Sequence, residues 1–160
     1  MLTDQFTQTL DTYGTAQDER AQARQSAGAA FDQLFGQARL AGWWVKLTGR
    51  PTALRALNNH PTRGARAPRT HSAQTRPVPL AEIVGSENRA EDFDAEFRPL
   101  ERHTRDRWIS IAAARRLGVA LPAVDLVAGP DGYYVRDGHH RISVARAAGQ
   151  LDIEARIVNN

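Results

Sequence analysis

The feature that most constrains the fold is a regular alternation of strand-like and helix-like segments after residue 77. Apolar and polar residues alternate in 122–127 and 153–158, as they do in half-buried strands, whereas 108–117 has helical spacing. Further strands are predicted at 78–84 and 133–136, and a second helix at 139–148. Strands mixed with helices predict an α+β domain of about 80 residues with a small mixed sheet, near the lower size limit for independent folding.

Glycines mark the turns of this domain. The run Gly129-Pro130-Asp131-Gly132 separates two predicted strands and has the composition of a hairpin turn. Gly118 and Gly149 follow the two predicted helices, where glycine commonly ends a helix. The sequence therefore predicts an antiparallel strand pair next to two short helices.

Composition divides the chain into an N-terminal helical arm (1–47), a basic linker (48–76) and the mixed domain (77–160). An apolar stripe at helical spacing runs along the arm and comprises Phe31, Leu34, Phe35, Ala38 and Ala41. Trp43 and Trp44 stand at its end. This pattern favours packing on the chain's own domain or on a second copy, which would make a homodimer; a membrane surface or another partner is the alternative.

The linker is rich in Pro, Gly, Thr and Arg and has almost no apolar residue after Leu57, so we expect it to be flexible. No acidic residue lies between Asp32 and Glu82. A segment of one charge sign attracts polyanions, and DNA bound without sequence preference is the partner we expect. A solvated linker without a partner is the alternative. The expected nucleic-acid contacts are Arg50, Arg55, Arg63, Arg66 and Arg69.

Several classes of protein are excluded or disfavoured by composition. The chain has no cysteine, which excludes disulfides, thiolate metal sites and cysteine nucleophiles. Its first residues lack the pattern of a signal peptide, and no apolar run approaches the roughly 18 residues of a membrane span. We therefore expect a cytoplasmic protein.

The stretch Asp137-Gly138-His139-His140-Arg141 is the most site-like part of the sequence. A predicted strand ends here, a glycine turns the chain and a helix begins, so free backbone N–H groups and the helix dipole would attract an anion. Arg141 would add a fork of donors that fits phosphate oxygens. In the alternative interpretation, Asp137 caps the helix and pairs with Arg141, and the histidines are exposed polar residues.

Residues 77–158 resemble the N-terminal domain of the ParB/sulfiredoxin superfamily. The resemblance rests on four stretches in the same order, namely Val78-Pro79-Leu80-Ala81-Glu82-Ile83, Asn88-Arg89-Ala90-Glu91-Asp92-Phe93-Asp94, Gly118-Val119-Ala120-Leu121-Pro122 and Gly138-His139-His140-Arg141. It implies a nucleotide site in which Gly138, His139, His140 and Arg141 hold the phosphates, with Arg89 facing them and Asp137 beside them. Sulfiredoxins have their reacting cysteine at the position of His139, so their reaction is excluded in this chain.

The resemblance also implies a nucleoside di- or triphosphate with Mg²⁺ as cofactor. The chain would then be an NTP-hydrolysing switch; a Mg²⁺-dependent phosphotransferase or nuclease, or a non-catalytic interaction module, are the alternatives. Phosphoryl chemistry needs a carboxylate as base or metal ligand, and the candidates are Glu87, Glu91, Asp92 and Asp137. We expect Glu87 in the catalytic role, although a solvated loop acid would give the same sequence. The charged run around His103 fits a solvated helix face better than an extension of the phosphate site.

Overall fold

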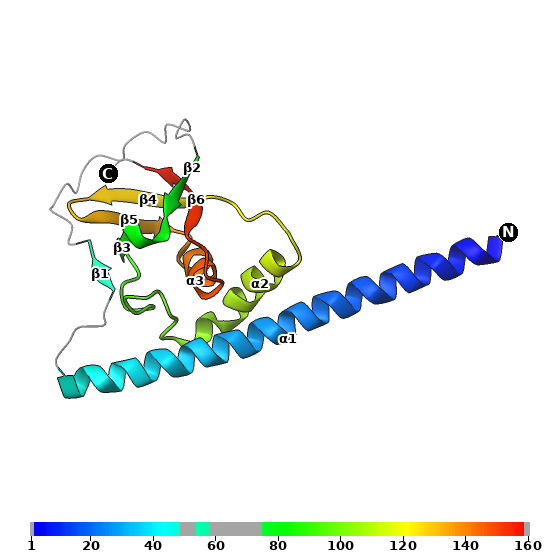
Figure 1. Ribbon diagram of the computed structural model, residues 1–160, viewed down its shortest axis with the longest axis horizontal. Helices are drawn as coiled ribbons and strands as arrows, with labels where there is room; N and C mark the ends of the chain where they lie inside the picture. The colour runs from blue at the N-terminus through cyan, green and yellow to red at the C-terminus, as the bar shows by residue number, and fades with distance from the viewer. Residues whose placement is uncertain (1, 49–53, 58–74, 159–160) are drawn as a thin grey trace.

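A computed structural model describes residues 2–48, 54–57 and 75–158 of the chain (Figure 1). The described helices are α1 (Leu2–Thr48), α2 (Arg105–Arg116) and α3 (His139–Ala147), with the 3₁₀ turns η1 (Leu80–Glu82) and η2 (Arg102–Thr104). The described strands are β1 (Arg55–Ala56), β2 (Arg76–Pro79), β3 (Ile83–Ser86), β4 (Val124–Gly129), β5 (Gly132–Asp137) and β6 (Asp152–Ile157). The mixed α and β composition confirms the predicted fold class.

One sheet joins the six described strands in the order β1-β3-β5-β4-β6-β2. The pairs β1–β3, β3–β5 and β4–β6 are parallel, whereas β4–β5 and β2–β6 are antiparallel. The hairpin predicted at residues 129–132 joins β4 to β5, with Gly129 opposite Gly132. The carboxyl ends of the parallel neighbours β3 and β5 therefore lie at the same edge of the sheet.

Helix α3 lies between the sheet and the other two helices, which gives the molecule its layers (Figure 1). Its Ile142 and Ala145 belong to the apolar core against the sheet, whereas Val144 belongs to a second core shared with α1 and α2. A short amphipathic helix that buries two faces is stabilised mainly by this packing. The start of α3 is consequently held in place from both sides.

Helix α1 is long and packs across α2 through the predicted stripe. Phe31 and Phe35 are buried, and Phe31 meets the ring of Trp108 edge to face at 5.7 Å. Asp32 accepts two hydrogen bonds from the guanidinium of Arg105, at 3.1 and 2.9 Å. Trp108 also donates its indole N–H to Ser143 Oγ at 2.9 Å, so it ties α2 to α3 as well. The prediction that the stripe packs on the chain's own domain is confirmed.

Helix α1 (Leu2–Thr48) spans nearly the whole of the helical arm expected at 1–47, but two details of the N-terminal half differ from the sequence-based expectations. Trp43 and Trp44 are 68% and 65% exposed, so the packing expected for the stripe does not extend to them. Within the linker, 54–57 lies against the sheet because Leu54 is buried in the main core and β1 pairs with β3. These four residues of the stretch expected to be flexible thus contact the folded domain.

The remaining linker residues (49–53 and 58–74) lie outside the described part of the chain, and with them Arg50, Arg63, Arg66 and Arg69. Arg55 is described and forms an ion pair with Asp131. Of the described helices, none has both the length and the apolar character that crossing a bilayer requires.

Candidate functional site

A polar pocket of about 200 Å³ opens at the start of α3. Four elements meet there: the loop after β3, the middle of α2, the end of β5 and the first turn of α3. The sequence-predicted residues Arg89, Asp137, Gly138, His139, His140 and Arg141 are all brought together in this pocket, and Asn88, Arg107, Ile111 and Arg136 complete its lining. The predicted cluster thus exists as one place in the fold.

Gly138 is the residue that allows β5 to turn directly into α3. Its φ of 103° lies in the left-handed region, which side chains disfavour. A Cβ at this position would lie 2.5 Å from Cγ1 of Val124, a buried core residue. The first helical bond that follows runs from the Ile142 N–H to the Gly138 carbonyl, so the N–H groups of 139–141 precede the helical ladder. These N–H groups and the helix dipole favour an anion at the pocket.

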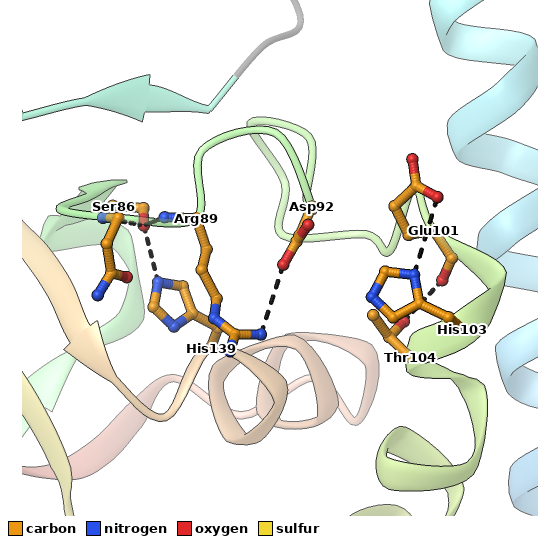
Figure 2. Close-up of polar contacts among 8 residues, drawn as sticks. Ser86, Arg89, Asp92, Glu101, His103, Thr104 and His139 are labelled. Atoms are coloured by element: carbon orange, nitrogen blue, oxygen red, sulfur yellow. Dashed lines mark hydrogen bonds and ion pairs between the residues drawn. The ribbon is translucent and has the colours of Figure 1, made fainter.

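His139 is buried and points toward the loop after β3 (Figure 2). Its Nε2 lies 2.7 Å from Ser86 Oγ, and its ring stacks on Phe93 with centroids 6.0 Å apart. Burial, followed by the nearby guanidinium of Arg89, lowers the pKa of His139 from 6.5 to about 4. The imidazole is therefore neutral at physiological pH and contributes a hydrogen-bonding group without a charge.

His140 is buried as well, with 6% of its surface exposed. The rings of His140 and Phe93 meet edge to face, with their centroids 5.3 Å apart and an angle of 84° between the ring planes. Burial, with Arg107 as the next contribution, lowers the pKa of His140 to about 4. Its Nε2 is buried without a hydrogen-bond partner, which is costly unless something else supplies one. The alternative that both histidines are exposed polar residues is wrong.

Arg141 is held by the protein itself. Its guanidinium donates to the carbonyls of Pro122 and Ala123 at 2.7 and 2.9 Å, and to Asp137 Oδ2 at 2.7 Å. The Asp137–Arg141 pair belongs to the alternative interpretation of the sequence, but Asp137 does not cap the helix, because Gly138 holds the cap position without a side-chain bond. Arg141 therefore ties the segment before β4 to α3, and both terminal nitrogens of its guanidinium are engaged.

Glu87 is engaged too. Both of its carboxylate oxygens accept hydrogen bonds from the Arg136 guanidinium, at 2.6 and 2.9 Å, in a bidentate ion pair. The structure thus places the acid expected to be catalytic beside the pocket lining, but in a contact with an arginine. Asp92 lies 3.5 Å from Arg89, and Glu91 is exposed.

The side chains of two other arginines of the pocket lining make few or no polar contacts with the residues that the structure describes. Within the described part of the chain, Arg107 has no hydrogen-bond or ion-pair partner, and Arg89 reaches only Asp92 at 3.5 Å (Figure 2). Both raise the positive potential at the histidines, since they contribute to the lowered pKa values there. The sequence indicated Arg89 and missed Arg107. The only signal for Arg107 was its place in the charged run 102–107, for which the solvated interpretation was preferred.

That interpretation does hold for His103, which is 71% exposed and lies 3.9 Å from Glu101, on the far side of Asp92 from His139 (Figure 2). Residues 103 and 107 would be one turn apart if both were in one α-helix. His103 lies in η2, before α2 begins, so this spacing does not apply to it and Arg107. The charged run therefore contains Arg107, which lines the pocket, and His103, which is exposed on the surface.

The pocket has the donor set of an anion site more than that of a metal site. Among the residues that the structure describes, no three His, Asp or Glu side chains gather as they would around a metal ion. Asp137 is the one carboxylate in the lining given above, and it is paired with Arg141. A Mg²⁺ ion here would depend chiefly on the oxygens of a phosphate ligand.

The fold and the pocket together define a mixed α/β domain with a cationic pocket at a helix start. No protein-family model matches the chain, and no curated protein sequence matches it. Among solved structures, it is similar to a crystal structure of sulfiredoxin from Arabidopsis thaliana, with 17% identity and a TM-score of 0.38. That match covers 54% of this chain and 86% of the sulfiredoxin chain. The likeness concerns the shape of the domain, and no residue role is transferred from it.

Proposed function

We propose that the pocket binds the phosphate part of a nucleotide. The observation that carries this proposal is the meeting of three kinds of group at one point: the free N–H groups at the start of α3, two weakly committed arginines, and the buried, unpartnered Nε2 of His140. A phosphate would accept hydrogen bonds from the N–H groups and pair with the arginines, and His140, which lines the same pocket, carries a buried polar nitrogen without a partner among the described residues. The nucleotide class is also what the ParB/sulfiredoxin resemblance of the sequence implies.

The size of the pocket indicates how such a ligand would be held. Its volume of about 200 Å³ is smaller than the roughly 300–1,000 Å³ of pockets that enclose a whole organic ligand. We infer that the phosphates lie inside and the nucleoside lies over the rim. Recognition would then depend on charge and hydrogen bonding more than on the base.

We propose binding alone. Turnover would need a free carboxylate, and Asp137, the one carboxylate in the described pocket lining, is paired with Arg141. Hydrolysis or phosphate transfer needs a base that orients the nucleophile. Glu87 and Asp137 are both paired with arginines, so either would have to leave its partner before it could act. A switch that hydrolyses NTP with Mg²⁺, a phosphotransferase and a nuclease all share this requirement.

Calorimetric titration tests the proposal, with CTP, GTP, ATP and ADP each added with and without Mg²⁺. Arg107→Gln should weaken binding of the preferred nucleotide about tenfold, because it removes one charge-assisted contact. Arg115→Gln is the matched control, since Arg115 lies on the same helix and contacts Gln150 outside the pocket. Absence of binding by the wild-type protein, or equal losses in the two variants, would refute the proposed site.

A second candidate function rests on the charge segregation of the sequence. We propose that the acid-free stretch after Asp32 binds DNA without sequence preference, through Arg50, Arg63, Arg66 and Arg69. Arg55 is the least available of the predicted contacts because it is paired with Asp131. The logarithm of a duplex binding constant should fall linearly with the logarithm of salt concentration; an affinity that hardly changes with salt contradicts this function.

A further inference from the structure

Ser86 lies at the end of β3, fully buried, and its hydroxyl oxygen has three polar neighbours (Figure 2). The backbone N–H groups of Asn88 and Arg89 donate to Oγ at 3.2 and 2.8 Å. Nε2 of His139 lies 2.7 Å from the same oxygen. The loop that carries Arg89 and the first residue of α3 are thus joined at one buried hydroxyl group.

The arrangement of these neighbours determines where the protons are. A serine hydroxyl has one proton and two lone pairs, and the two amide donors occupy the lone pairs. The proton then has to point at the third neighbour, Nε2 of His139, which must accept it with its own lone pair. In a neutral imidazole with a bare Nε2, the ring proton is on Nδ1. The pKa of about 4 ensures that His139 is neutral near pH 7.

We propose that Ser86 is a positioning residue that holds His139 in the Nδ1-protonated tautomer, so that the ring offers a neutral N–H donor to a phosphate oxygen in the pocket. The part that concerns phosphate rests on the proposed function. With the other tautomer, Nδ1 would direct a lone pair at the anion. The buried Ser86 proton would also have no acceptor among the described residues, since His139 is the only one of its three neighbours that can accept it.

A neutral donor suits this particular pocket. Arg89 and Arg107 already supply positive charge there, and a protonated His139 would be repelled by the guanidinium of Arg89. An Nδ1–H group adds a hydrogen bond to the phosphate without that repulsion. The tautomer, and not the charge, of His139 would therefore decide whether the residue supports or opposes anion binding.

The tautomer can be measured in the ligand-free protein. Long-range ¹H–¹⁵N correlation spectra distinguish the two neutral forms of each imidazole, and the His139 signals are those lost in His139→Asn. We expect Nδ1–H in the wild-type protein and a shift toward Nε2–H in Ser86→Ala. An Nε2–H ring in the wild type, or a ring that stays Nδ1–H in Ser86→Ala, would overturn the assignment. The wild-type spectrum decides the first point even if Ser86→Ala does not fold.

Two substitutions of His139 separate the donor from the bond to Ser86. The amide nitrogen of an asparagine can take the place of Nδ1, whereas that of a glutamine reaches the place of Nε2. Calorimetry with inorganic diphosphate should show His139→Gln about tenfold weaker than wild type and His139→Asn closer to it. The reverse order would overturn the donor role.

Failure of the proposed function gives a different result. A wild-type protein with the Nδ1–H tautomer that binds neither diphosphate nor any of the four nucleotides would refute the phosphate site, and the donor role with it. The dependence of the tautomer on Ser86 would then stand as established by the spectra alone.

Discussion

The two walls of the pocket use arginine in opposite ways. On the wall formed by the end of β5 and the start of α3, Arg136 and Arg141 are held by short bonds to Glu87, Asp137 and backbone carbonyls. On the wall formed by α2 and the loop after β3, Arg107 has no partner among the described residues and Arg89 has a distant one. The first wall therefore builds the pocket, whereas the second is available to a ligand.

The largest expected effect comes from charging the histidines between the two walls. Both folded-state pKa values are lowered from 6.5 to about 4, so between these pH values the unfolded chain binds protons that the folded chain does not. The stability contributed in full above pH 6.5 should be lost as the pH falls toward 4, by on the order of 2 kcal/mol or more per histidine. Urea unfolding at successive pH values measures this loss.

His140→Leu isolates one histidine, because Nε2 of His140 has no hydrogen bond to lose. The variant should lower the pH dependence of the free energy of unfolding by about half in this window, if the two histidines contribute equally. His103→Leu serves as the control for the removal of an exposed histidine. Parallel curves for wild type and His140→Leu would mean that His140 is not buried in its neutral form.

The next effect concerns the wall that builds the pocket. Gly138→Ala places a side chain in the left-handed region and against Val124, and should lower the free energy of unfolding by about 3 kcal/mol. Gly36→Ala is the control within α1, where a Cβ meets nothing within 4 Å and should stabilise the helix by up to about 1 kcal/mol. Equal stability of the two variants would contradict the left-handed conformation of Gly138 at the start of α3.

Arg141→Ala should act on stability and Arg107→Gln on affinity. Loss of the Arg141 bonds to the carbonyls of Pro122 and Ala123 and to Asp137 should reduce the free energy of unfolding by about 2 kcal/mol. Arg107→Gln removes no bond within the described structure and should change stability by less than about 0.5 kcal/mol. Chemical unfolding of both variants without ligand checks the contrast, and equal losses would remove the distinction between the two walls.

The sequence predicted most elements of the mixed domain because their patterns are local, but the single strand expected at 78–84 is wrong: the 3₁₀ turn η1 divides this stretch into β2 and β3, which are not neighbours in the sheet. Apolar alternation marked β4 and β6, the Gly129–Gly132 turn marked the hairpin, and Gly138 marked the start of α3. β1 escaped detection because two residues show no periodicity, and its pairing with β3 depends on the burial of Leu54 in a distant core.

The roles within the site depend on contacts that no local pattern contains. Arg141 finds carbonyls at Pro122 and Ala123, almost twenty positions earlier in the chain, and these engage its guanidinium although the residue lines the pocket. Phe93 packs on both histidines from a loop more than forty positions away and contributes to the burial that lowers their pKa values. The motif thus predicted where the site lies, whereas these long-range contacts decide which of its residues are free to bind.

The smallest expected effect concerns Arg89, on the wall formed by α2 and the loop after β3. Among the residues that the structure describes, Asp92 is the only side-chain partner of the Arg89 guanidinium, and the 3.5 Å separation and the half-exposed Arg89 side chain make the pair weak. Asp92→Asn should release Arg89 and remove a negative charge near the pocket, which would strengthen the binding of inorganic diphosphate about twofold. Asp106→Asn, on the exposed first turn of α2, is the control and should leave the affinity unchanged. Weaker binding by Asp92→Asn would show that Asp92 positions Arg89 for the ligand, and that both walls are built by ion pairs.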